Sequence, residues 1–314
     1  MSACPVCEGP ATFAASVPDA TGVSGRTFAI FRCSNCSLGF VEPELSDEDL
    51  ARYYPDTFYG GRASSTQVAL AVFMAARARI VTRARPRLRT LLDVGCGAGD
   101  FLDAMRARGV QVVGMEPSAG GRERARARGM EVHASIAMLP PGEFDVITLW
   151  HVAEHVRDVV RVLAACRQKL APGGRMVVAV PNAESWEAQV FGQRWFHLDV
   201  PRHQLQFSSR ALGEALGRAG LVVDHRAKFS LETDPFGMLQ SALNCLPIEH
   251  NALYQVAKHD RPIGSLALLD RLAVSAAPLF APLAAIAELG LSRAGLNGTL
   301  CVVARPVDEK IQSG

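Results

Sequence analysis

The sequence has little net charge, few lysines and no long apolar run that proline or charge does not interrupt. Its 33 Lys and Arg residues almost balance 31 Asp and Glu residues, so the formal net charge is +2 and does not call for a nucleic-acid partner. The chain does not open with a basic stretch followed by an apolar core, so we expect no signal peptide and a cytoplasmic protein. Residues 272–287 carry no charge, but Pro278 and Pro282 interrupt this short stretch, which argues against a transmembrane helix.

The composition is sufficient for a large hydrophobic core. With 314 residues, 49% of them hydrophobic, we expect one large domain with smaller additions. Nearly all the positive charge is arginine, concentrated in residues 77–89 and 122–128. We interpret these runs as solvated helix faces, with a phosphate-binding stripe as the alternative.

Apolar strands alternate with helical segments from Leu88 onward. This alternation predicts an α/β fold with a doubly wound, mostly parallel sheet. The candidate strands are residues 90–94, 111–115, 130–133, 144–150, 175–180, 221–228 and 299–305.

The first of these strands ends in a glycine-rich turn, Asp93-Val94-Gly95-Cys96-Gly97-Ala98-Gly99, that leads into a helix. Glycines permit positive φ and let the backbone approach a ligand, and a helix N-terminus offers unpaired N–H groups. The second strand ends at Glu116, about twenty residues later, where a carboxylate can bind both hydroxyls of a ribose. The turn and Glu116 therefore predict a nucleoside site at the carboxyl edge of the sheet.

Residues 92–99 together with Glu116 resemble the cofactor site of class I S-adenosylmethionine-dependent methyltransferases, and the resemblance extends over about residues 88–230 and 299–306. A dinucleotide enzyme favours G-x-G-x-x-G, whereas here the third glycine, Gly99, comes one residue early. The resemblance implies S-adenosylmethionine as cofactor and a seven-stranded Rossmann-like sheet whose last strand is antiparallel. The cofactor residues that it implies are Asp93, Gly95, Cys96, Gly97, Gly99, Glu116, Ser135 and Trp150, with Ser135 in place of a more usual acidic residue.

Two Cys-x-x-Cys pairs near the N-terminus have the spacing of zinc ligands. Cys4 and Cys7 form one pair and Cys33 and Cys36 the other, with an alternating β-like segment at 27–32 between them. Each pair fits a tight knuckle, and two knuckles can enclose Zn²⁺ in four thiolates. We predict a structural zinc ribbon, with a redox or metal-free role as the alternative.

The fourth strand runs into His151-Val152-Ala153-Glu154-His155, where the chemistry of an open α/β sheet is expected. His155 is the candidate general base, Glu154 a group that orients it, and His151 a residue packed under the cofactor. The Glu154-His155 pair at this position resembles the pair found in zinc-ribbon sugar C-methyltransferases, in which the histidine acts as base. Substrate binding or packing by His155 is the alternative.

The same segment also matches two metal-binding patterns. Glu154, His155 and a later histidine resemble the divalent-metal ligands of small-RNA 3′-terminal methyltransferases, although His151 stands where those enzymes have their first Glu. The string also matches an inverted zincin motif. We reject that second match because these residues leave a strand end and do not lie on a continuous helix.

The segment 182–207 is dense in aromatic and polar side chains and predicts part of the acceptor pocket, with a loop packed on the sheet as the alternative. The expected acceptor-binding residues are Tyr53, Tyr54, Tyr59, Asn182, Trp195, His197, Arg202 and His203. The apolar stretch 265–291 is expected to pack on the core or on a second subunit in a homodimer, or to meet a membrane surface or a lipid-linked substrate.

Four segments follow from these patterns. They are a zinc ribbon at 1–42, a helical connector or lid at 43–87, a methyltransferase domain at 88–230 and 299–308, and an apolar helical insertion at 231–298. The resemblance implies methyl transfer to a small-molecule acceptor, either a sugar or another specialised metabolite. The alternatives are RNA base methylation and a non-catalytic zinc-ribbon adaptor.

Overall fold

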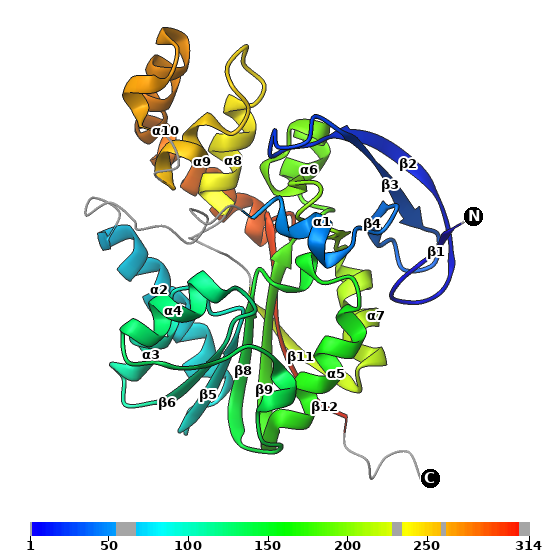
Figure 1. The fold of residues 1–314 in the computed structure, drawn as a ribbon, viewed down its shortest axis with the longest axis vertical. Helices are drawn as coiled ribbons and strands as arrows, with labels where there is room; N and C mark the ends of the chain where they lie inside the picture. Colours follow the sequence, from blue (N-terminus) through cyan, green and yellow to red (C-terminus); the bar gives the residue numbers. More distant parts are fainter. Residues whose placement is uncertain (1, 55–66, 228–233, 259–261, 308–314) are drawn as a thin grey trace.

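The computed structural model describes residues 2–54, 67–227, 234–258 and 262–307, which form two β-sheets with helices around them (Figure 1). The larger sheet has the order β11-β12-β9-β8-β5-β6-β7. Its strands are β5 (Thr90–Val94), β6 (Gln111–Met115), β7 (Glu131–His133), β8 (Phe144–Trp150), β9 (Leu170–Pro181), β11 (Leu221–Ala227) and β12 (Thr299–Pro306). All seven occur where the sequence predicts them, and β12 is antiparallel to β9, as expected.

Helices cover both faces of this sheet (Figure 1). One side carries α2 (Gln67–Ala84), α3 (Asp100–Arg106) and α4 (Ala119–Ala127), and the other carries α5 (Val159–Lys169) and α7 (Ser209–Arg218). Successive residues of a strand feed opposite cores: Leu91 packs in the cluster with α2 and α3, whereas Leu92 packs in the cluster with α5 and α7. Both faces are therefore buried, which explains the continuous apolar runs of the central strands.

The smaller sheet is antiparallel and contains the paired cysteines. Its strands are β1 (Ser2–Ala3), β2 (Pro10–Pro18), β3 (Thr27–Cys33), β4 (Gly39–Glu42) and β10 (Leu205–Gln206), followed in the chain by the short helix α1 (Asp47–Ala51). The sequence did not predict β10, which pairs with β4 and fixes the loop after β9 against this sheet. Phe40 of β4 and Phe207 share one apolar cluster with α5 and α7, so the two sheets have a continuous core.

The insertion contributes α8 (Asp234–Leu243), α9 (Ala252–Ala257) and α10 (Leu268–Arg293). The long helix α10 runs through Pro278 and Pro282 and lies at the top of the molecule in the view of Figure 1. By length and composition it is apolar enough to cross a membrane, and only 22% of its most apolar window is buried. Leu279 and Ile286 are 77% and 69% exposed, so this face of α10 is not covered by the protein core.

Three buried carboxyl groups join α10 to the rest of the molecule. Glu187 of α6 (Trp186–Phe191) hydrogen-bonds Glu288 of α10, and Asp234 of α8 lies close by and accepts a 2.6 Å hydrogen bond from the Thr299 hydroxyl. Burial, and then the neighbouring Glu288, raise the pKa of Glu187 to about 10. Glu187 therefore keeps its proton at neutral pH and can donate to Glu288, which avoids placing two adjacent charges in a buried site.

Candidate active site

The glycine turn after β5 requires glycine for conformational and steric reasons. Gly95, Gly97 and Gly99 have φ angles of 73°, 54° and 85°. A Cβ on Gly95 would lie 2.5 Å from Cγ2 of Val152, in the segment after β8. The turn is thus packed directly against the end of the fourth strand, and its backbone remains uncovered by side chains of its own.

Two carboxyl groups shape the space beside this turn. Glu116 is 2% exposed, and its carboxylate accepts hydrogen bonds from the Gly97 N–H (2.9 Å) and the Ser118 N–H (2.8 Å). Asp93, also buried, accepts a 2.6 Å hydrogen bond from the Thr148 hydroxyl, and burial raises its pKa to about 7.

The chain is strained where it leaves β8. His151 has a φ of 56°, a conformation that costs a residue with a Cβ about 1–3 kcal/mol and that is found mainly at functional sites. The next turn, Ala153–His155, buries Glu154 to 1% exposure, with its Oε1 3.3 Å from Nδ1 of His151. Burial alone would raise the pKa of Glu154, but the surrounding histidines, His151 first, hold it below its ordinary value. Glu154 is therefore a buried carboxylate.

His155 and His203 meet beside this carboxylate. Their ring centroids are 4.7 Å apart, and Nδ1 of His155 lies 3.0 Å from the Arg202 carbonyl oxygen and 2.9 Å from the Tyr54 hydroxyl. Nδ1 of His203 lies 2.7 Å from the His197 carbonyl oxygen. A carbonyl oxygen only accepts, so Nδ1 of each ring carries a proton, and the lone pair of the neutral form lies on Nε2. Burial, and then the neighbouring His155, lower the pKa of His203 and keep it neutral.

A family model described as a methyltransferase domain matches residues 68–226, about half of the chain. The chain belongs to this methyltransferase family. The ubiquinone biosynthesis O-methyltransferase of Bradyrhizobium sp. (strain ORS 278) is 38% identical over 128 residues, which cover 38% of this chain and 51% of that protein. The ubiquinone biosynthesis O-methyltransferase of Chelativorans sp. (strain BNC1) is 33% identical over 151 residues, covering 43% and 60%. The chain thus spans little more than half the length of these curated relatives.

Among solved structures, the chain is similar to a SAM-dependent methyltransferase from Archaeoglobus fulgidus. The TM-score is 0.44 at 17% sequence identity, and the alignment covers 74% of this chain and 93% of that chain. A putative sarcosine dimethylglycine methyltransferase from Galdieria sulphuraria gives a TM-score of 0.48 at 15% identity, with coverage of 82% and 98%.

The residues of this methyltransferase fit S-adenosylmethionine. Besides the open glycine turn and Glu116, the buried Nε1 of Trp150 has no hydrogen-bond partner within the described residues, so an N–H donor is available beside the turn. The Cys96 side chain packs against β6, because its Sγ lies only 2.6 Å from where a Cβ on Gly114 would be. Ser135 is exposed in the turn after β7, where its side chain does not cap the following Ile136–Met138 turn.

The cysteine pairs converge as the sequence predicts. One Sγ of each of Cys4, Cys7, Cys33 and Cys36 lies within 4.8 Å of the others, and the Cys4–Cys36 and Cys7–Cys33 sulfur distances are 3.6 and 3.4 Å. A tetrahedral zinc with Zn–S bonds of about 2.3 Å separates its sulfurs by about 3.8 Å. The backbone N–H groups of Val6 and Asn35 point at Cys4 and Cys33, which stabilises thiolates. The four thiols therefore fit a structural zinc ion.

The residues expected to bind the acceptor fall into two groups. Tyr54, Arg202 and His203 contact His155, and His197 accepts a hydrogen bond from His203 through its carbonyl oxygen. The others take part in packing: Tyr53 packs edge-to-face against Phe28 of the small sheet, Asn182 donates to the Asn297 carbonyl, and the Trp195 indole donates to Glu187. Tyr59 lies outside the described residues.

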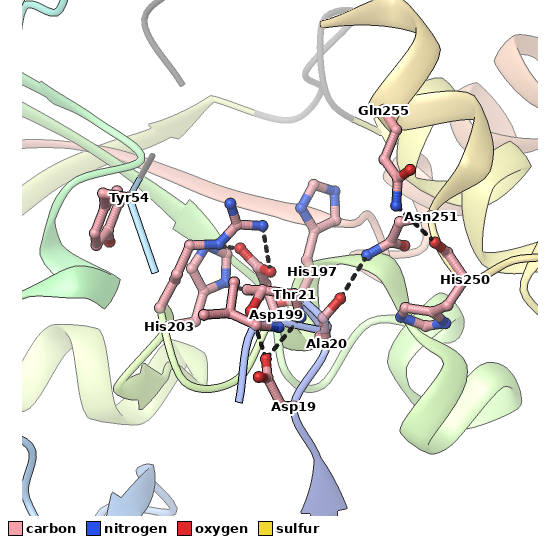
Figure 2. Close-up of polar contacts among 12 residues, drawn as sticks. Asp19, Ala20, Thr21, Tyr54, His197, Asp199, His203, His250, Asn251 and Gln255 are labelled. Atoms are coloured by element: carbon pink, nitrogen blue, oxygen red, sulfur yellow. Dashed lines mark hydrogen bonds and ion pairs between the residues drawn. The ribbon is translucent and has the colours of Figure 1, made fainter. Parts of the chain in front are cut away.

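The structure adds residues to this region that sequence reasoning missed. Figure 2 shows the Asp19–Thr21 turn of the small sheet, Asp199 of the loop and His250 and Asn251 of the insertion gathered in one place, with Tyr54 on the other side of His203 in this view. Asp199 accepts a 2.7 Å hydrogen bond from Arg202, and the Asn251 amide reaches the Ala20 carbonyl at 3.5 Å. Asp199 itself has a left-handed conformation (φ 34°), which Asp adopts more readily than most residues, so an Asp in this loop is a signal that could have been used.

Proposed function

We propose that this methyltransferase transfers the methyl group of S-adenosylmethionine to a hydroxyl oxygen of a small-molecule acceptor, which His155 activates. The names of the curated relatives support oxygen as the acceptor atom. The names of these relatives do not point specifically to the sugar or other specialised metabolite expected from the sequence, and that finer expectation stays a prediction. When bound, the cofactor supplies a methyl group on a positively charged sulfur that an oxygen nucleophile can attack in line.

The observation that carries this proposal is the state of the His155 ring. Nδ1 is committed to the Arg202 carbonyl oxygen, so the Nε2 lone pair is the one that a proton can reach. His155 stands three residues after Val152, which touches the glycine turn, so the ring belongs to the same carboxyl edge as the cofactor residues. In the simplest form of the mechanism, Nε2 accepts the hydroxyl proton as the oxygen attacks the methyl carbon.

The residues around the ring serve this step in different ways. The Tyr54 hydroxyl, 2.9 Å from Nδ1, and the buried guanidinium of Arg202 offer donors to an oxygen-rich acceptor. The Arg202 guanidinium is itself held by Asp199, at 2.7 Å. Such a fixed arrangement orients an acceptor and excludes water, which in-line displacement needs.

The test replaces the base and leaves the cofactor site intact. We expect His155→Ala to lower the rate of labelled methyl transfer to a panel of phenols, catechols and sugars by about 10²–10⁴-fold. Its affinity for S-adenosylhomocysteine should remain near that of the native protein. The control is His133→Ala, since His133 pairs with Glu131 at the far edge of the sheet. Unchanged turnover in His155→Ala would remove His155 from the reaction.

A further inference from the structure

Glu154, His155 and His203 form a three-residue group with the chemistry of a metal site. Two of them come from the turn after β8 and the third from the loop before β10, and one ligand atom of each lies within 4.8 Å of the other two. The cysteine group described above is the other such group found among the described residues. The two are separate, because the thiols belong to the small sheet and the histidines to the edge of the large one.

Both rings are held in the way that metal-binding histidines usually are. A metal ligand normally donates its second ring N–H to a carbonyl or carboxylate, which fixes the tautomer and the ring direction. His155 donates Nδ1–H to the Arg202 carbonyl at 3.0 Å, and His203 donates Nδ1–H to the His197 carbonyl at 2.7 Å. Two neighbouring imidazoles thus present Nε2 lone pairs, and two lone pairs cannot hydrogen-bond each other.

The carboxylate is an independent indication. Glu154 is 1% exposed; its Oε1 pairs with Nδ1 of His151 at 3.3 Å, whereas its Oε2 has no hydrogen-bond partner among the residues that the structure describes. A buried carboxylate is costly unless it is paired, hydrogen-bonded or bound to a metal. The Oε2 of Glu154 and the lone pairs of the two rings can share one partner, a cation.

We propose that Glu154, His155 and His203 bind a divalent cation of the transition series, such as Zn²⁺, Mn²⁺, Fe²⁺ or Co²⁺. Two imidazoles and one carboxylate suit these ions, and three protein ligands leave positions open for other oxygens. Hard ions that prefer only oxygen ligands, such as Ca²⁺, fit this set less well.

This inference rests on the proposed function and changes one step of it. With the cation in place, His155 is a ligand, and the acceptor hydroxyl binds at an open position where the cation lowers its pKa. The hydroxyl proton leaves to solvent, the oxygen attacks the methyl carbon, the S–CH₃ bond breaks and the O–CH₃ bond forms. The products are the methyl ether and S-adenosylhomocysteine.

The test is a Mn²⁺ titration followed by electron paramagnetic resonance, on full-length protein whose ribbon keeps its zinc. Mn²⁺ prefers oxygen and nitrogen ligands and does not displace zinc from thiolates, so it reports on the second site alone. We expect one Mn²⁺ to bind the native chain, and Glu154→Gln and His203→Ala to lose it. His133→Ala is the matched control, because it removes a histidine that faces a carboxylate, Glu131, at 2.8 Å.

The same samples are titrated with S-adenosylhomocysteine by calorimetry, which also shows that each variant is folded. Mn²⁺ binding that is lost in Glu154→Gln and kept in His133→Ala supports the cation site. No Mn²⁺ binding by the native chain, or binding that both ligand variants retain, overturns it. A chain that binds Mn²⁺ but not S-adenosylhomocysteine would contradict the proposed function while leaving the cation site standing, so the two failures are distinguishable.

Discussion

Replacing Gly95 with alanine tests whether the glycine turn is packed as the structure has it. The φ of 73° costs a residue with a Cβ about 1–2 kcal/mol. The new Cβ would also lie 2.5 Å from Cγ2 of Val152, and overpacking of this kind costs about 1–3 kcal/mol. We therefore expect Gly95→Ala to lower the free energy of unfolding by about 2–5 kcal/mol.

Val152→Ala separates the two contributions, because it removes the methyl group that the new Cβ would meet. In a double-mutant cycle measured by urea unfolding, we expect the two substitutions to be coupled favourably by about 1–3 kcal/mol, which is the contact part of the cost. The cost of the positive φ at residue 95 should remain in the double mutant. Gly95→Ala should also weaken S-adenosylhomocysteine binding, because any shift of the turn moves the backbone that we expect to face the cofactor. Each 1.4 kcal/mol of binding free energy lost would raise the Kd roughly tenfold.

The matched control is Gly213→Ala. Gly213 lies in the interior of α7, and a Cβ there would meet nothing within 4 Å. Alanine is the better helix former, so this substitution should stabilise the protein by about 0.5–1 kcal/mol and leave ligand binding unchanged. Strictly additive effects of the Gly95 and Val152 substitutions, or a neutral Gly95→Ala, would refute the reasoning.

Two further predictions concern α10. The raised pKa of Glu187, about 10, means that its stabilising proton is fully bound below the unfolded-state pKa near 4.5 and is lost as pH rises toward 10. Between pH 6 and 9, the free energy of unfolding in urea should therefore fall with pH in the native chain, and in Glu187→Gln the slope should be shallower by up to about 1.4 kcal/mol per pH unit. The control, Glu123→Gln, replaces an exposed carboxylate and should match the native slope. Equal slopes for all three proteins would contradict a shared proton. The exposed apolar face of α10 predicts that the protein binds anionic lipid vesicles and floats with them in a density gradient. The double substitution Leu279→Glu and Ile286→Glu should abolish this vesicle binding. A native protein that stays in the soluble fraction would exclude a membrane contact.

The sequence predicts the parts of this molecule that are locally encoded. The seven strands follow from short apolar runs, and the turn from Gly95 to Gly99 follows from glycines at a strand end, because these signals lie within a few residues of each other. The two cysteine pairs are likewise local, and a shared zinc needs no knowledge of the rest of the fold to be expected.

The parts that could not be predicted depend on contacts between distant residues. The strand β10 has only two residues and exists because it pairs with β4, so no run of apolar residues marks it. His203 joins Glu154 and His155 only because β10 fixes that loop, and the sequence could say no more than that a later histidine was available. Glu187 and Glu288 resemble ordinary solvated helix residues in the sequence, and their burial against each other follows from how the insertion docks.

Calorimetry with S-adenosylmethionine and S-adenosylhomocysteine tests the central claim most directly. We predict that the native chain binds both at a single site and that Glu116→Ala, which removes the carboxylate held by Gly97 and Ser118, weakens both. Failure of the native protein to bind either compound would contradict the assignment of the glycine turn, and with it the methyl transfer derived from it.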